Sequence, residues 1–142
     1  MIIPDLNVLL YAIDSSSPRH GEAAAWLEKS VNAAIDVVGI PWVVHLGFLR
    51  LTTNPRVFSR PLTVETASDW LESLESAPSV RMIDPGMAHR GILRHLLLML
   101  GTGANLVTDA HLAALALEHN AVLATGDRDF QRFPGLKLEL LF

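Results

Sequence analysis

Aspartates in three short segments are the residues of this chain best suited to chemistry. Asp5 follows an apolar start, Asp109 lies within a long apolar stretch, and Asp127 and Asp129 follow a third apolar run. A carboxylate beside apolar residues is costly to desolvate unless it is paired, hydrogen-bonded or bound to a metal. Convergence of the three segments would create a site for a hard divalent cation such as Mg²⁺ or Mn²⁺.

Each aspartate also has a plain structural explanation. Asp5 and Asp127 stand just before segments with helical spacing, where an aspartate commonly caps the helix. Asp109 is harder to explain in this way, because apolar residues precede it and the nearly continuous apolar run 112–117 follows. An unpaired carboxylate is unfavourable in such surroundings. A functional role therefore explains Asp109 better than a structural one.

Length and composition indicate one domain, residues 1–142. Half of the residues are hydrophobic, enough for a single core. The absence of Cys excludes a disulfide scaffold and a cysteine nucleophile, and it fits a reducing compartment. The N-terminus lacks the basic region of a secretory signal, and the apolar stretches are shorter than the ~20 residues that span a bilayer. We expect a soluble cytoplasmic protein with no membrane segment.

Apolar periodicity predicts alternating strands and helices, hence an α/β fold in which helices flank a central, mostly parallel, twisted sheet. Ligands of such sheets bind at the carboxyl ends of the strands, near the point where strand order reverses. Asp5 and Asp127 are expected at that edge, and Asp109 can face it from the first turn of its helix. The predicted strands are 1–4, 35–40, 79–83, 121–124 and 136–141, and the predicted helices are 5–13, 18–31, 41–51, 63–74, 86–100, 105–119 and 127–133.

Several motifs resemble those of one protein family. The string DLNVLLYA at residues 5–12 resembles the opening motif of PIN-domain proteins, particularly the VapC-type toxins. LVTDAHLAA at 106–114 and ATGDRDF at 124–130 resemble two further motifs, and FLR at 48–50 with TNP at 53–55 resembles another. Each motif is weak alone. Together, in this order, they are specific and span almost the whole chain.

The resemblance implies a single PIN-like domain and a Mg²⁺- or Mn²⁺-dependent endoribonuclease that cleaves RNA phosphodiester bonds by hydrolysis. It also implies the toxin of a type II toxin–antitoxin pair, which forms a homodimer and binds a VapB-like antitoxin. On the matched positions, the catalytic and metal-binding residues are Asp5, Asp109 and Asp127, and the supporting residues are Asn7, Thr125 and Asp129.

The cations are mostly arginine, whose planar guanidinium suits RNA phosphates. Arg128, beside the acidic segment, and Arg50 are the first candidates for such contacts. GC-rich codon usage would produce the same bias toward arginine, so the two explanations stay open.

One position departs from the family pattern. PIN domains usually carry a Glu just before the FLR segment, and this chain has Gly47 there, as does a subset of mycobacterial VapC-type toxins. A helical Gly costs about 1 kcal/mol relative to Ala, which predicts the close approach of a neighbouring helix. The missing carboxylate leaves an alternative open: a catalytically weakened PIN domain that binds RNA or a partner. A receiver-type phosphotransfer domain fits less well, because Lys137 falls inside a predicted strand.

The remaining distinctive residues have structural explanations. Trp26, Trp42 and Trp70 occupy apolar helical positions and are expected in the core. The histidines lack zinc-like spacing, and His111 is expected at the surface or supporting the site. The first two helices are rich enough in apolar residues to leave an exposed protein interface. In the resembled family, the C-terminal segment of the antitoxin occupies such a groove.

Overall fold

The computed structural model describes all residues from Met1 to Phe142. Five parallel strands form one sheet in the order β3-β2-β1-β4-β5. The predicted α/β fold is therefore confirmed, with a sheet that is parallel throughout. The strands are β1 (Ile2–Pro4), β2 (Val38–Pro41), β3 (Val80–Ile83), β4 (Val122–Thr125) and β5 (Lys137–Leu140).

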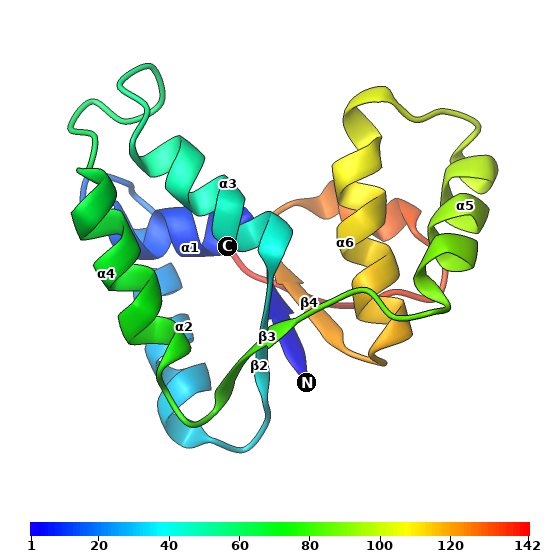
Figure 1. Cartoon of the computed structure of the whole chain (residues 1–142), viewed down its shortest axis with the longest axis horizontal. Coiled ribbons are helices and arrows are strands. Elements are labelled where there is room, and N and C mark those ends of the chain that lie inside the picture. The colour runs from blue at the N-terminus through cyan, green and yellow to red at the C-terminus, as the bar shows by residue number, and fades with distance from the viewer.

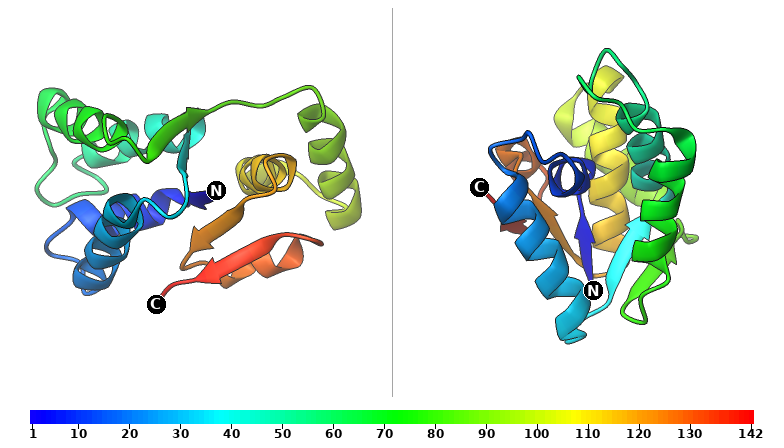
Figure 2. Two further views of the ribbon diagram at one scale, coloured as in Figure 1. Left: turned by 90° about the horizontal axis from the view of Figure 1, so that it is seen from below. Right: turned by 90° about the vertical axis from the view of Figure 1, so that its left-hand side faces the viewer.

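Helices cover both faces of the sheet (Figure 1). Helices α1 to α4 lie to the left of the strands in that view, and α5 and α6 lie to the right; the second pair of views agrees (Figure 2). The helices are α1 (Leu6–Ile13), α2 (His20–Ala33), α3 (Trp42–Thr52), α4 (Val64–Glu75), α5 (His89–Leu100) and α6 (Val107–Glu118), with short 3₁₀ turns η1 (Ala104–Leu106) and η2 (Arg128–Arg132).

The strand order reverses between β1 and β4. The chain first moves outward from β1 through β2 to β3, then crosses to β4 and β5 on the other side of β1. Pro4 pairs with Ala124 across this junction, and the backbone N–H of Asp5 donates to the Ala124 carbonyl at 2.8 Å. The reversal point is where open parallel sheets bind ligands, and Asp5 stands directly on it.

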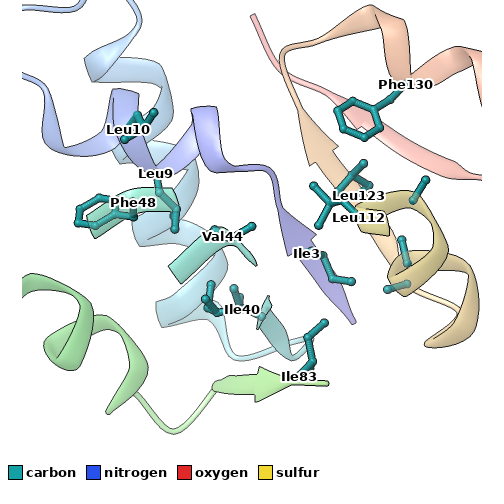
Figure 3. Close-up of a cluster of buried hydrophobic side chains, with 14 of the residues drawn as sticks. Ile3, Leu9, Leu10, Ile40, Val44, Phe48, Ile83, Leu112, Leu123 and Phe130 are labelled. Atoms are coloured by element: carbon teal, nitrogen blue, oxygen red, sulfur yellow. The ribbon is translucent and has the colours of Figure 1, made fainter. Parts of the chain in front are cut away.

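The hydrophobic core lies on both faces of the sheet (Figure 3). Leu9, Val44 and Phe48 lie to one side of β1, and Leu112 and Phe130 lie to the other. All of these side chains are buried. Coverage of both faces explains why the inner strands β1, β2 and β4 are apolar runs, as expected for a parallel sheet, whereas the edge strand β5 alternates Lys137 and Glu139 with leucines.

Some predicted boundaries and one predicted core residue are wrong. Strand β2 begins at Val38 and not at the predicted residue 35. The preceding residues form a turn in which Ile35 is 90% exposed and Asp36 binds the N-terminal amine. Trp42 is 50% exposed at the start of α3, whereas Trp70 is half-buried and stacks on Phe48. Apolar spacing at the first turn of a helix does not reveal which face the next layer covers.

Two other predicted helices differ in their first turns. Helix α5 begins at residue 89 rather than 86, and the start of the predicted helix 105–119 is the 3₁₀ turn η1. Gly101 ends α5 in a left-handed conformation, with φ of 69°, as glycines at helix ends often do. None of the helices combines the length and apolar character that crossing a membrane requires.

Candidate active site

Asp5 is a buried carboxylate at the carboxyl end of β1. It occupies the N-cap position of α1, but its side chain makes no capping hydrogen bond. Its Oδ2 atom instead accepts a hydrogen bond from Thr125 Oγ1 at 2.9 Å, across 120 positions of sequence. The simple capping explanation for Asp5 is therefore wrong, and its side chain faces the end of β4.

Burial raises the pKa of Asp5 from 3.8 to about 6. The hydrogen bond from Thr125 opposes this effect, while the charges of Asp109 and Asp127 add to it. A carboxylate removed from water and close to other carboxylates resists ionisation, and perturbed groups of this kind cluster at functional sites. Asp5 is therefore a carboxyl whose charged form its surroundings disfavour.

Thr125 connects the end of β4 to the loop that follows. Its hydroxyl donates to Asp5 and accepts from the backbone N–H of Asp127 at 3.0 Å. Thr125 is fully buried, so the two contacts fix its rotamer. These are the loop-orienting hydrogen bonds expected of this residue.

Asp109 lies in the first turn of α6, half-buried. The favourable end of the helix dipole is there, but burial raises the pKa of this carboxyl, and the charge of Asp127 raises it further. Arg132 acts in the opposite direction, and Asp129 adds a smaller increase. Residues separated by more than a hundred positions thus bring their charges to one edge of the sheet.

Asp127 and Asp129 organise the short turn η2. The Asp127 side chain caps this turn by accepting from the backbone N–H of Asp129 at 2.8 Å. Asp129 is exposed and forms an ion pair with Arg132 at 3.0 Å. The capping explanation for Asp127 is therefore correct, and Asp127 still adds its charge to Asp5 and Asp109. Sequence reasoning missed Arg132, although its spacing of three from Asp129 was a signal.

The acidic groups fit a hard cation in their chemistry, because all their donors are carboxylate oxygens. No three His, Asp or Glu side chains lie close enough to hold one ion together. The arrangement therefore suits an ion that takes one or two carboxylates and keeps several waters, as Mg²⁺ does. Among the acids that affect the pKa of Asp5, Asp109 has the larger effect.

Gly47 has the structural reason that its position in a helix predicted. A Cβ atom at Gly47 would lie 2.6 Å from Leu6 Cδ2, so α3 packs on the first residue of α1. Leu6 immediately follows Asp5, which places Gly47 beside the site. The leucine side chain fills the space that a larger residue at position 47 would need.

The other predicted residues lie in different surroundings. Asn7 is exposed and its side chain forms no hydrogen bond, so it gives Asp5 no direct support in this structure. Arg128 is exposed at the start of η2, next to Asp127. Arg50 is exposed in the last turn of α3. Both arginines stay candidates for phosphate contacts.

A histidine pair behind the site was not apparent in the sequence. His89 Nε2 and His111 Nδ1 lie 2.8 Å apart and link α5 to α6. His89 is buried, and its Nδ1 faces Glu118 at 3.4 Å. Burial lowers the pKa of His111, and His89 lowers it further. The predicted supporting position of His111 thus has a specific partner, 22 residues away in sequence.

Comparison with known proteins agrees with this fold and shows the family. The PIN domain family model matches residues 2–136. Ribonuclease VapC37 of Mycobacterium tuberculosis is 46% identical over 141 residues, covering 96% of this chain and 94% of that protein. Ribonuclease VapC33 of the same species is 39% identical over 137 residues, covering 96% and 95%.

Solved structures share the same architecture. VapBC2 from Rickettsia felis, bound to a DNA fragment from its promoter, superposes with a TM-score of 0.74 at 22% identity and full coverage of both chains. VapBC-1 from nontypeable Haemophilus influenzae gives a TM-score of 0.68 at 20% identity, covering 99% and 98%. The fold and the site together define a class of protein: an α/β domain with acidic residues where the strand order of a parallel sheet reverses. The chain belongs to the PIN domain family, among its VapC members.

Proposed function

We propose that this protein is a Mg²⁺- or Mn²⁺-dependent endoribonuclease, the toxin of a type II toxin–antitoxin pair. It cleaves RNA phosphodiester bonds by hydrolysis at the acidic edge of the sheet. A toxin of this kind acts where cellular RNA is, so the proposal includes a cytoplasmic location. The relatives named as ribonucleases, up to 46% identical, support an enzyme over a module that only binds.

The proposal rests mainly on the burial, the raised pKa and the hydrogen bonding of the Asp5 carboxyl. This carboxyl is buried, has a pKa of about 6, and receives a hydrogen bond from Thr125 at 2.9 Å. A structural aspartate would be expected to pair with a cation or to cap a helix, and Asp5 does neither. A nearby divalent ion would favour its charged form.

Asp5 and Asp109 are the residues proposed to hold the ion, with Asp127 at the margin. When bound, Mg²⁺ supplies Lewis acidity toward the scissile phosphate and toward water. Thr125 holds the Asp5 carboxylate in one orientation and ties it to the loop at Asp127. The α6 dipole favours a negative charge at Asp109. The chain contains no Cys, so a cysteine nucleophile is excluded and hydrolysis suits it.

An apolar groove supports the partner in this proposal. A cavity of about 430 Å³ between α1, α2 and α4 is lined mostly by apolar residues, among them Ala12, Leu27, Val31, Trp70 and Leu74. We propose that the C-terminal segment of a VapB-like antitoxin occupies it. The exposed Leu98 and Met99 of α5 form a separate apolar surface for a homodimer.

Substitution of the two proposed ligands tests the function. We expect Asp5→Asn and Asp109→Asn to lower cleavage of total bacterial RNA by at least about 100-fold, the usual cost of losing one group that stabilises developing charge. Excess EDTA should have the same effect on the unaltered protein, and Mn²⁺ should restore activity. Asp69→Asn, an exposed acid on α4, is the matched control.

Circular dichroism of each variant establishes that it is folded before activity is compared. Undiminished cleavage by both ligand variants, or by the unaltered protein in EDTA, would contradict the proposal. RNA binding without cleavage at saturating Mn²⁺ would instead support the weakened PIN domain that the absence of an acid at Gly47 suggested.

A further inference from the structure

Arg19 lies beside the acidic site but takes no part in the hydrogen bonds around its aspartates. Arg19 is exposed and immediately precedes α2. Helix α2 ends just before β2 begins, so its first turn lies at the opposite end of the sheet, where the strands end (Figure 1). Arg19 therefore stands at the edge that carries Asp5.

Two aromatic rings hold the Arg19 guanidinium. Its Cζ atom lies 5.5 Å from the centroid of the Tyr11 ring and 5.2 Å from that of Phe142. The two rings meet edge to face, with centroids 5.5 Å apart and planes at 84°. Both distances are within the ~6 Å range of cation–π contacts. The rings thus position the charge without using its N–H donors.

Those N–H donors are free. The guanidinium forms no hydrogen bond or ion pair within the chain. Only the backbone of Arg19 is bonded: its N–H donates to Ser17 Oγ at 3.1 Å, and its carbonyl accepts from the N–H of Ala23 at 3.0 Å. A planar guanidinium with unused donors matches the oxygens of a phosphate. By contrast, Arg132 is already paired with Asp129.

The guanidinium also lies against the loop of the acidic site. A Cβ atom at Gly126 would be 3.4 Å from Arg19 Nη1 and 2.5 Å from Phe142 Cδ2. Gly126 stands between Thr125, which binds Asp5, and Asp127. A side chain at Gly126 would displace the Phe142 ring. Glycine at this position therefore allows Arg19 and Phe142 to pack closely against the loop.

We propose that Arg19 binds a backbone phosphate of the RNA strand in the active site. The inference rests on the proposed ribonuclease function. RNA approaching this edge meets the negative charges of Asp5, Asp109 and Asp127, which repel phosphates. Arg19 supplies an unpaired positive charge beside them, held in place before RNA arrives. A preorganised cation loses little conformational freedom when it binds.

The test measures RNA binding in a protein that does not cleave. Asp5→Asn is combined with Arg19→Gln, Arg19→Lys or Tyr11→Leu, and fluorescence anisotropy follows a labelled single-stranded RNA at several salt concentrations. The matched control combines Asp5→Asn with Arg81→Gln, an exposed arginine on the edge strand β3. Thermal melting establishes that each protein is folded.

Arg19→Gln should weaken binding several-fold and reduce the slope of log K against log salt by about 0.7, the value for one phosphate contact on single-stranded RNA. Arg19→Lys and Tyr11→Leu keep the charge, so both should weaken binding while the slope stays unchanged. Arg81→Gln should change neither quantity. The inference would be overturned if the Arg19→Gln protein had the same affinity and slope as the Arg81→Gln control. It would also be overturned if the Asp5→Asn parent bound no RNA at low salt.

This outcome is separate from the proposed function. Continued RNA cleavage by Asp5→Asn would contradict the active-site assignment, whatever Arg19 does. Loss of cleavage in Asp5→Asn, together with unchanged binding in the Arg19→Gln variant, would overturn only the role of Arg19.

Discussion

At the scale of single residues, Asp5 combines burial with a raised pKa. It is only 8% exposed, and burial keeps its pKa near 6 despite the Thr125 hydrogen bond. The residue therefore works against stability whenever it is charged and no cation is present. Such a conflict between local stability and charge is typical of functional sites.

The pH dependence of stability should reveal this conflict. The folded protein holds the Asp5 proton more tightly than the unfolded chain, so the stabilisation is complete below pH 3.8 and is lost as pH rises through about 6. A neutral Asn has no such loss. Asp5→Asn should therefore raise the free energy of unfolding by about 3 kcal/mol at pH 8, the equivalent of the pKa change from 3.8 to about 6.

Urea unfolding of both proteins at pH 8 and at pH 3.5, without divalent ions, measures this difference. Little difference is expected at pH 3.5, because the carboxyl is protonated in the folded state and mostly protonated in the unfolded state. An Asn variant no more stable than the original at pH 8 would show that the folded state does not suppress ionisation of Asp5.

At the scale of elements, the contact between α1 and α3 limits the residue that can stand at position 47. Helix α3 approaches α1 so closely that Leu6 occupies the space beside Gly47. A Cβ atom at Gly47 would lie 2.6 Å from Leu6 Cδ2, so a larger residue at position 47 would require the Leu6 side chain to move. The two positions should therefore be energetically coupled, because each determines the volume available to the other.

A double-mutant cycle tests this coupling. Gly47→Ala alone should destabilise the protein through contact with Leu6, partly offset by the better helix propensity of Ala. Leu6→Ala alone should destabilise it by leaving a gap. The double variant should be more stable than the sum of the two effects by about 1 kcal/mol. Additive free energies in urea unfolding would show that the two helices do not compete for this space.

At the scale of the whole molecule, the site joins the two halves of the fold. Asp5 stands between β1 and α1, and Asp109 lies in the first turn of α6. Helices α1 and α6 cover opposite faces of the sheet (Figure 2). An ion held by both residues would bind the folded chain and not the unfolded one. Binding of this kind stabilises the folded state by about 2.7 kcal/mol when the ion is at 100 times its Kd.

Thermal melting with Mn²⁺ measures this stabilisation without any RNA. The unaltered protein should melt several degrees higher at saturating Mn²⁺ than in EDTA. Asp5→Asn and Asp109→Asn should lose most of the shift, and Asp69→Asn should keep it. Equal shifts in all four proteins would show that the ion binds elsewhere.

The sequence by itself determined the element types and the acidic chemistry. Apolar runs predicted the inner strands within a few residues, because burial on both faces leaves a continuous apolar signal, and alternation predicted the edge strand β5. The same reasoning placed Asp5 and Asp127 after strands. The motifs then identified the family. These are local properties, and the chain encodes them within a few positions.

Only the tertiary structure decided which residues touch. Three contacts join segments that are far apart in sequence: the hydrogen bond from Thr125 to Asp5, the His89–His111 pair and the contact of Arg19 with Gly126. The exposure of Trp42 likewise depends on which face of α3 the next layer covers. Such contacts follow from strand order and helix packing, which no local pattern encodes, and so the acidic groups and their neighbours became visible as a unit only in the folded chain.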